Sequence, residues 1–406
     1  MISKCIIIKN YVALIKMEIF FLELKDLSPK EILELLDKKK LNSSSKKGEI
    51  WEITNEIKPI DLFCYLSAKY GDPNGILTIL KNDNSDNLIR WDWMLDSPKG
   101  LVHIQGHNFR TEIHVSGEVI ESGLNKFDFI SQIKADFKNY GQGISITKKS
   151  LEKWTEFINP YYRIKSTIEQ SFIKLNELNL NLEQDRIDLK ITQNQLEFEE
   201  VKERWTQTLQ KYDFAVGQVF GLRAMLPVMA ESFVNFLLFI LARPEIKSND
   251  RLYQTTIRQP IDIRVQSLHL NCNGFSSNVD YTAEECKKFQ TLMNERNDLL
   301  HGNVNINKQA FGNVYFDNKM PIFDEYEDFW EKSIGVSIRT MNIESIHGEY
   351  EVVKNFINYI LSKLNENIKE QIEHLLETSR LGFNEETKRV GILFSPYLVD
   401  MRGFTK

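Results

Sequence analysis

Residues 281–302 read YTAEECKKFQTLMNERNDLLHG and carry helix signals at both ends. Thr282 followed by Glu285 is the pattern of a capping box, in which two side chains bind the first free backbone amides of a helix. Gly302 is typical of a helix C-terminus, because glycine adopts the left-handed conformation there at little cost. The spacing of apolar residues predicts a buried stripe made of Cys286, Phe289, Met293 and Leu300. We expect one amphipathic helix over this stretch.

Two neighbouring segments supply helices for this one to pack against. Residues 224–242 read AMLPVMAESFVNFLLFILA, which is close to the length of a membrane-spanning helix. Polar or helix-breaking residues interrupt the segment at Pro227, Glu231, Ser232 and Asn235. We therefore expect a buried core helix with the proline near its start. Residues 347–364, HGEYEVVKNFINYILSKL, form a third amphipathic pattern, and the set predicts an α-helical bundle over residues 214–364.

The first part of the chain, residues 1–145, alternates helix and strand signals. Residues 27–39 contain a capping-box pattern at Ser28 and Glu31, and a further helical segment ends at Gly71. Short strand-like runs follow, namely GILTILK (75–81), NLIRWDWML (87–95), LVHIQG (101–106) and FRTEIHV (109–115). Turn residues separate these runs, which indicates an antiparallel meander. The expected fold class is an α+β N-terminal domain followed by an α-helical bundle domain.

The remaining segments lie between the two domains and at the two ends of the chain. Residues 146–213 are polar and mostly helical in pattern, which predicts a connector, although apolar residues alternate as in a strand within residues 179–192. Residues 365–406 predict one more helix and an irregular tail. Residues 1–25 are apolar but are interrupted by charges, so we expect a strand or buried segment and not a targeting peptide. Met17 is an alternative start codon.

Composition excludes several classes of protein. The chain has 406 residues, 42% of them hydrophobic, which excludes a disordered or low-complexity chain. The 51 basic and 57 acidic residues give a net charge of −6, which excludes a wholly basic nucleic-acid coat but not a local basic groove. The four cysteines form no CxxC pair, so a disulfide framework and a cysteine-based zinc site are not expected. We expect a cytoplasmic protein without a cofactor.

The last turns of the 281–302 helix carry a chemically competent group of residues: Arg296, Asn297 and His301. Here the chain resembles the HEPN superfamily, whose signature is an arginine, a polar residue and a histidine after four to six intervening residues. The resemblance covers residues 214–364. It implies a small helical bundle, a metal-independent endoribonuclease that acts as a homodimer, and a setting in bacterial toxin or anti-phage systems. A regulatory partner such as an antitoxin, and regulation by residues 1–145, belong to the same expectation.

The residue types suit RNA cleavage, in which the 2′-OH attacks the adjacent phosphate. Histidine ionises near neutral pH, so His301 suits acid–base work. Arg296 stays charged and binds phosphate oxygens in a planar fork. Asn297 suits orienting the arginine or the phosphate, or holding the interface between two copies. Five residues of helix turn through about 500°, so Arg296 and His301 point about 140° apart. One helix does not present both to one phosphate, so either the helix end loosens at Gly302 or two copies combine, and the resemblance implies the second.

Alternatives stay open at this point. Arg264 and His269 have the same spacing, but the segment upstream of Arg264 lacks helix signals. His103, His107 and His114 resemble a metal cluster only superficially, and strand or turn positions are the simpler interpretation. Cations near a helix C-terminus also occur for electrostatic reasons alone. The chain is therefore either a nuclease, or a non-catalytic HEPN-like scaffold that binds a nucleotide or a protein, or an enzyme whose chemistry lies in residues 1–145.

Overall fold

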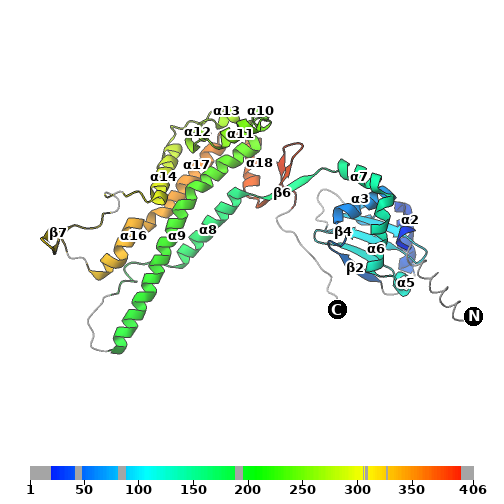
Figure 1. The fold of residues 1–406 in the computed structure, drawn as a ribbon, viewed down its shortest axis with the longest axis horizontal. Coiled ribbons are helices and arrows are strands. Elements are labelled where there is room, and N and C mark those ends of the chain that lie inside the picture. The colour runs from blue at the N-terminus through cyan, green and yellow to red at the C-terminus, as the bar shows by residue number, and fades with distance from the viewer. Residues whose placement is uncertain are drawn as a thin grey trace, which may run out of the picture. The chain divides into compact units, whose positions relative to one another are not determined.

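The computed structural model of the chain describes residues 20–41, 48–80, 88–187, 195–304, 306, 310–325 and 328–394. The described chain forms two compact units that meet in sequence between Lys153 and Trp154. The expectations for residues 1–19, Met17 included, lie outside the described residues. The expected α+β unit followed by a helical unit is confirmed at this level, and Figure 1 shows each unit with its elements labelled.

Unit 1 is built on a five-stranded antiparallel sheet with strand order β1-β3-β4-β5-β2. Its strands are β1 (Lys25–Asp26), β2 (Glu49–Ile53), β3 (Trp91–Asp96), β4 (Val102–Gly106) and β5 (Thr111–Val115). Its helices are η1 (Phe20–Leu22), α2 (Pro29–Leu41), α3 (Pro59–Tyr70), α4 (Ile76–Ile79), α5 (Gly117–Glu121), α6 (Lys126–Asp136), η2 (Phe137–Asn139) and α7 (Gly141–Ser150). The predicted meander is confirmed as β3-β4-β5.

One face of this sheet forms the core of unit 1. Trp93, Ile104 and Ile113 lie opposite one another on β3, β4 and β5, and all are fully buried. Tyr65 of α3 and Phe129 of α6 close the core from the helical side. Trp93 therefore packs in the core beneath the sheet and is not available to a ligand.

Two helix signals in unit 1 are confirmed. The backbone amide of Ser28 donates to the Glu31 carboxylate at 2.8 Å, and the amide of Glu31 donates to the Ser28 hydroxyl at 3.4 Å. Gly71 ends α3 with a φ of 82°. These signals depend only on residues within one turn, so they are readable from sequence.

The strand expected at residues 75–81 is wrong, because Ile76–Ile79 form the short helix α4. Asp92 of β3 accepts hydrogen bonds from the amides of Leu77 and Thr78 at 3.3 and 2.8 Å. A carboxylate on another element thus accepts hydrogen bonds from the free amides at the start of α4. Nothing in the sequence of the turn itself indicates this contact.

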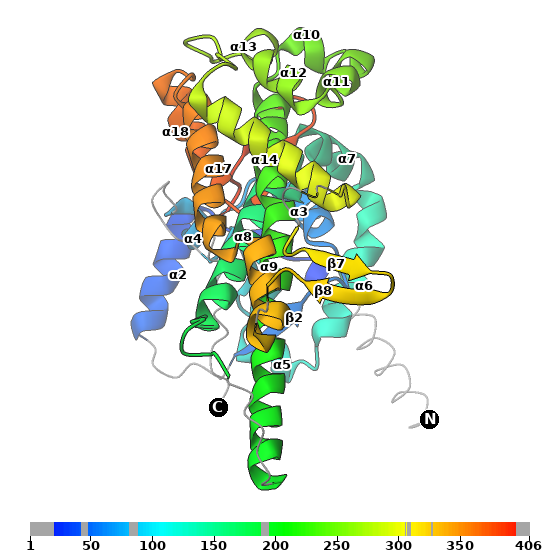
Figure 2. The same cartoon turned by 90° about the vertical axis from the view of Figure 1, so that its left-hand side faces the viewer.

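Unit 2 is built around α9, a helix of 47 residues against which α8, α14 and α17 pack (Figure 2). Its long helices are α8 (Pro160–Glu177), α9 (Gln195–Leu241), α14 (Glu284–His301), α17 (Ile346–Leu361) and α18 (Glu366–Leu376). Its short helices are α10 (Pro244–Lys247), α11 (Asp250–Ile257), α12 (Ile261–Gln266), α13 (Leu268–Asn271), η3 (Glu331–Gly335), α16 (Val336–Met341) and η4 (Ile343–Ser345). Its strands are β6 (Trp154–Ile158), β7 (Val314–Asp317), β8 (Met320–Phe323), β9 (Arg380–Asn384) and β10 (Val390–Gly391).

Three expectations for this region need correction. Pro227 lies in the interior of α9 and not near a helix start. The separate connector at 146–213 does not form, because β6 pairs with β9 and α8 places Ile168 and Phe172 in the core of unit 2. The tail after α18 continues as the β9–β10 hairpin and is therefore not irregular up to Gly391.

The apolar part of α9 forms the core of the helical unit. By length and composition alone, α9 contains a stretch that is apolar enough to cross a membrane. Half of that stretch is buried inside the protein. Phe233, Val234 and Leu237 are completely buried there. This burial favours the expected core helix, since a core helix passes the same compositional test.

Candidate functional site

The helix that carries the candidate residues is held between α9 and α17. On α14 the buried side chains are Cys286, Phe289, Leu292 and Met293, and the Phe289 ring stacks on Phe356 with centroids 4.2 Å apart. The expected stripe is thus confirmed except at Leu300, which is 45% exposed. Leu300 lies beyond the stretch where the neighbouring helices cover α14.

The sequence signal for the C-terminal end of α14 is confirmed, and the signal for its N-terminal end is wrong. Gly302 adopts the left-handed conformation with a φ of 64°, which confirms the C-cap. The capping box at Thr282 and Glu285 does not form, because the amide and hydroxyl of Thr282 both donate to Asp280, at 2.8 and 2.7 Å. The helix begins at Glu284 instead.

Arg296 lies half-buried at the C-terminal end of α14. Its Nη1 donates to the Oδ1 of Asn297 at 3.0 Å. Its Nε is buried and has no hydrogen-bond partner among the described residues. The side chain lines a cavity of about 640 Å³ between α9, α14 and the α16–α17 region. The guanidinium is thus oriented by its neighbour and retains a donor that the described protein does not use.

His301 is the last residue of α14 and is exposed. It does not line the cavity beside Arg296, and no hydrogen bond or ion pair joins it to the motif residues in the described part of the chain. The structure therefore brings Arg296 and Asn297 together and leaves His301 apart, in agreement with the angular separation expected from helix geometry.

Arg223 of α9 is a cavity residue that the sequence analysis missed. It donates to both carboxylate oxygens of Glu349 at 2.8–3.1 Å and to the Asn342 carbonyl at 3.0 Å. It also binds the Ser345 hydroxyl at 2.9 Å and the carbonyl oxygen of Met341. Arg223 therefore ties α9 to the start of α17 and shapes the cavity wall. An arginine inside an apolar helix is the signal that could have found it.

The other charged side chains around the cavity, which include the acidic Glu295 and Asp298, have partners of different kinds. Arg339 forms an ion pair with Glu331, and Asp298 accepts a hydrogen bond from the Asn303 side chain at 2.9 Å. Arg223 is neutralised by Glu349. Among the arginines around the cavity, Arg296 is thus the one with a buried donor that has no partner in the described chain. A guanidinium donor of this kind suits an anionic ligand.

The competing motif at Arg264 and His269 has a different environment. Arg264 is only 8% exposed, burial lowers its pKa, and it donates to the Asn235 side chain. The Nδ1 atom of His269 accepts from the amide of Val279 at 3.5 Å. These contacts make Arg264 part of the packing between α12 and α9, and a buried arginine is not placed to bind RNA.

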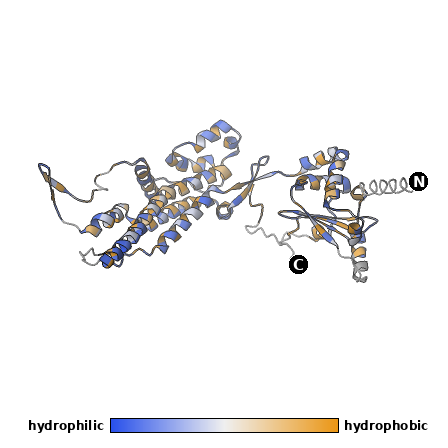
Figure 3. Cartoon of the chain, turned by 60° about the horizontal axis from the view of Figure 1, so that its bottom comes forward, coloured by the Kyte–Doolittle hydropathy of each residue, from blue (hydrophilic) through white to orange (hydrophobic). Residues whose placement is uncertain are grey.

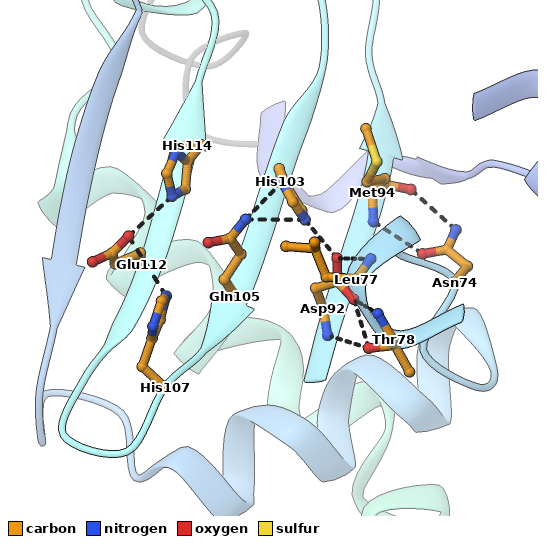
Figure 4. A network of polar contacts seen from close by, with 10 residues as sticks. All are labelled: Asn74, Leu77, Thr78, Asp92, Met94, His103, Gln105, His107, Glu112 and His114. Atoms are coloured by element: carbon orange, nitrogen blue, oxygen red, sulfur yellow. Dashed lines mark hydrogen bonds and ion pairs between the residues drawn. The ribbon is translucent and has the colours of Figure 1, made fainter. Parts of the chain in front are cut away.

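The histidines of unit 1 belong to a polar network on the other face of its sheet (Figure 4). The Nε2 of His103 lies 2.8 Å from the carboxylate of Asp92, and the Nε2 of His114 lies 3.1 Å from that of Glu112. His107 lies 3.6 Å from the same Glu112 carboxylate. Within the described residues, no group of three or more histidine, cysteine or acidic side chains is arranged to hold a metal ion. The three histidines occupy strand and turn positions.

The pKa values of the two carboxyl groups in this network are lowered. Burial alone would raise the pKa of Asp92, but hydrogen bonds from His103 and Thr78 outweigh it. Burial likewise opposes ionisation of Glu112, and Arg110 with its neighbouring histidines outweighs it. Both groups therefore remain charged at neutral pH, which is how buried carboxylates with several donors behave.

Comparison with known proteins adds no relative. No family model, curated protein or solved structure matches the chain. The activity is therefore inferred from α14, from the cavity beside it and from the charges around both.

Proposed function

We propose that the chain is a metal-independent endoribonuclease of the HEPN type, with Arg296, Asn297 and His301 as its reactive group. One observation carries the proposal. Arg296 lines a cavity of about 640 Å³, is oriented by Asn297 and keeps a buried Nε without a partner among the described residues. A phosphate oxygen would supply the missing acceptor, and His301 stands at the end of the same helix.

The chemistry needs no group beyond these side chains. The 2′-oxygen of RNA attacks the adjacent phosphorus, the bond to the 5′-oxygen breaks, and the products are a 2′,3′-cyclic phosphate and a 5′-hydroxyl. His301 takes the proton from the 2′-OH and returns it to the leaving 5′-oxygen. Arg296 stabilises the negative charge that develops on the phosphate, and Asn297 holds Arg296 in position.

The separation of Arg296 from His301 within one copy favours a composite site. In a homodimer, His301 of one copy would act on a phosphate held by Arg296 of the other. The proposal thus includes RNA as substrate and a second copy as partner. A cytoplasmic role in bacterial toxicity or anti-phage defence, with a restraining partner such as an antitoxin and a sensing role for unit 1, follows from the resemblance.

The test is RNA cleavage by the purified chain and by Arg296→Ala and His301→Ala variants. Total bacterial RNA is the substrate, and new 5′-hydroxyl and cyclic-phosphate ends are the readout. Two variants serve as matched controls: Arg258→Ala, at an exposed helix end, and His374→Ala, an exposed histidine in the last turn of α18. We expect activity in EDTA that only the motif variants lose.

The non-catalytic scaffold is the second candidate, and the exposed position of His301 outside the cavity is the observation that favours it. A scaffold would bind RNA or a nucleotide through Arg296 without cleaving it. Binding that Arg296→Ala weakens, with no cleavage by the unmodified chain, would replace the nuclease with the scaffold.

A further inference from the structure

The β7–β8 hairpin of unit 2 is an apolar element whose strands are exposed, although the Phe323 ring on β8 contacts the side chain of Lys332, with Nζ 4.3 Å from the ring centroid. Every residue of both strands is exposed, and their apolar or aromatic side chains are 41–66% exposed. These side chains are Val314, Tyr315, Phe316, Met320, Ile322 and Phe323. Figures 1 and 3 both show the hairpin standing away from the helices of its unit, and Figure 3 also shows hydrophobic residues on it.

Such a hairpin needs further strands to be stable. A two-stranded antiparallel ribbon is at best marginally stable in water, whereas three or more strands with an apolar face form a stable sheet. Contiguous exposed apolar residues on a soluble protein commonly mark an interaction site. The hairpin segment 311–325 carries three acidic residues, Asp317, Asp324 and Glu325, against Lys319. This charge disfavours the nucleic-acid backbone and favours a protein strand as the partner.

The hydrogen-bond register of the hairpin shows which backbone groups point outward from each of its two strands. The amide of Asp324 donates to the Asn313 carbonyl at 3.3 Å, so that pair is hydrogen-bonded. Bonded and non-bonded pairs alternate along an antiparallel ladder. Val314 with Phe323 and Phe316 with Pro321 are therefore the non-bonded pairs, and their backbone groups point outward.

Only one of these edges can extend the sheet fully. On β8 the outward position at residue 321 is a proline, which has no N–H to donate and is typical of a blocked edge. On β7 the outward N–H and C=O groups of Val314 and Phe316 are intact, and the described residues offer them no partner. An added strand would therefore pair with β7.

We propose that the added strand is β7 of a second copy of this chain, paired antiparallel about a two-fold axis at Tyr315. This register joins Val314 to Phe316 of the second copy, and both are outward-bonding positions, so the same edge satisfies itself. Apolar pairs form at Val314–Phe316 and Tyr315–Tyr315, while Asn313 lies opposite Asp317, so no like charges meet. The result is a four-stranded sheet in the order β8-β7-β7-β8.

This inference goes beyond the proposed nuclease and does not depend on it. It requires self-association through a named strand and makes no use of the α14 residues. A chain without any nuclease activity would still pair in this way, and an active nuclease that dimerises only through its helices would not.

A disulfide trap tests the pairing in the full chain. In a Cys5→Ser background, Tyr315→Cys places two thiols at the two-fold axis, where opposite Cβ atoms come within reach of a disulfide. Ile322→Cys is the matched control, because it lies directly opposite Tyr315 on β8 and is similarly exposed. Under mild oxidation we expect the covalent dimer to form about tenfold faster, or more, with Tyr315→Cys. Equal rates, or no dimer from either variant, would overturn the proposal.

Two proline variants then test the edge itself. Phe316→Pro removes the outward N–H of β7, and Phe323→Pro makes the same side-chain change on β8. Added to Tyr315→Cys, the first should abolish the covalent dimer and the second should leave it. An equal loss in both would show that the β7 edge is not the contact and would overturn the assignment.

Discussion

The guanidinium of Arg296 combines an oriented Nη1 with a buried Nε that has no partner among the described residues. A buried donor without an acceptor costs about 1–3 kcal/mol, and a bound phosphate oxygen would remove that cost. Arg296→Lys keeps the charge but loses the planar fork. We predict a fall in RNA cleavage of about 10- to 100-fold without loss of thermal stability. Unchanged cleavage rates in the lysine variant would contradict the assigned role.

A second residue-scale prediction concerns the buried ion pair of unit 1. Lys69 lies 2.9 Å from the Asp136 carboxylate, which also accepts from the Tyr65 hydroxyl at 2.6 Å. Asp136→Asn leaves a buried cation without its partner and should destabilise unit 1 by about 3–5 kcal/mol. Adding Lys69→Met removes the stranded charge and should recover most of that loss. Hydrogen exchange of unit 1 peptides in the full chain measures both changes, and no recovery would argue against this account.

The carboxyl group of Asp92 makes local stability depend on pH. Because its pKa is lowered in the folded chain, its contribution is complete above the unfolded value of about 3.9 and is lost as the pH falls through the folded value. We predict that the amides of Leu77 and Thr78, which donate to Asp92, exchange faster relative to neighbouring amides below about pH 4. Asp92→Asn should abolish this acid dependence, and its persistence in that variant would assign it to another group.

At the scale of the element, the end of α14 depends on a glycine. Gly302 has a φ of 64°, where a side chain costs roughly 1–2 kcal/mol. Gly302→Ala should therefore increase hydrogen exchange around residues 298–303. Gly348 is the matched control, since it lies inside α17 with open space around it, and Gly348→Ala should stabilise that helix by about 0.5–1 kcal/mol. If both substitutions changed hydrogen exchange equally, the cap at Gly302 would not be what stabilises the end of α14.

The same scale shows what sequence could and could not predict. The cap at Gly302 and the capping box at Ser28 depend on neighbours within a few residues, and both were predictable. The box at Thr282 failed because Asp280 binds that side chain first, and α4 was misassigned because its amides bind Asp92 from another strand. Local signals are reliable until a competing partner intervenes.

The sequence likewise predicted only part of the candidate site. Arg296, Asn297 and His301 were recognisable from their spacing, whereas the cavity beside them was not. Arg223 contributes to that cavity through contacts with Glu349 and its neighbours, which are far away in the sequence. Only the folded chain brings these side chains together.

At the scale of the whole molecule, the chain has two units, whereas the sequence predicted a separate connector between an α+β domain and a helical bundle. Residues 146–213 have the polarity of a connector, yet β6 completes a sheet with β9 from the end of unit 2. A strand that pairs across the length of a domain leaves no local trace. The N-terminal sheet, in contrast, was predictable because its central strands are consecutive.

The central claim concerns two copies of the chain, because Arg296 and His301 point apart on one helix. The most direct test mixes the Arg296→Ala and His301→Ala variants, each inactive alone, and measures RNA cleavage in EDTA. If the site is composite, mixed dimers hold one intact pair, and activity should return to about a quarter of that of the unmodified chain. No return of activity in dimers shown to have exchanged subunits would contradict the composite site, and RNA left intact by the unmodified chain would contradict the nuclease.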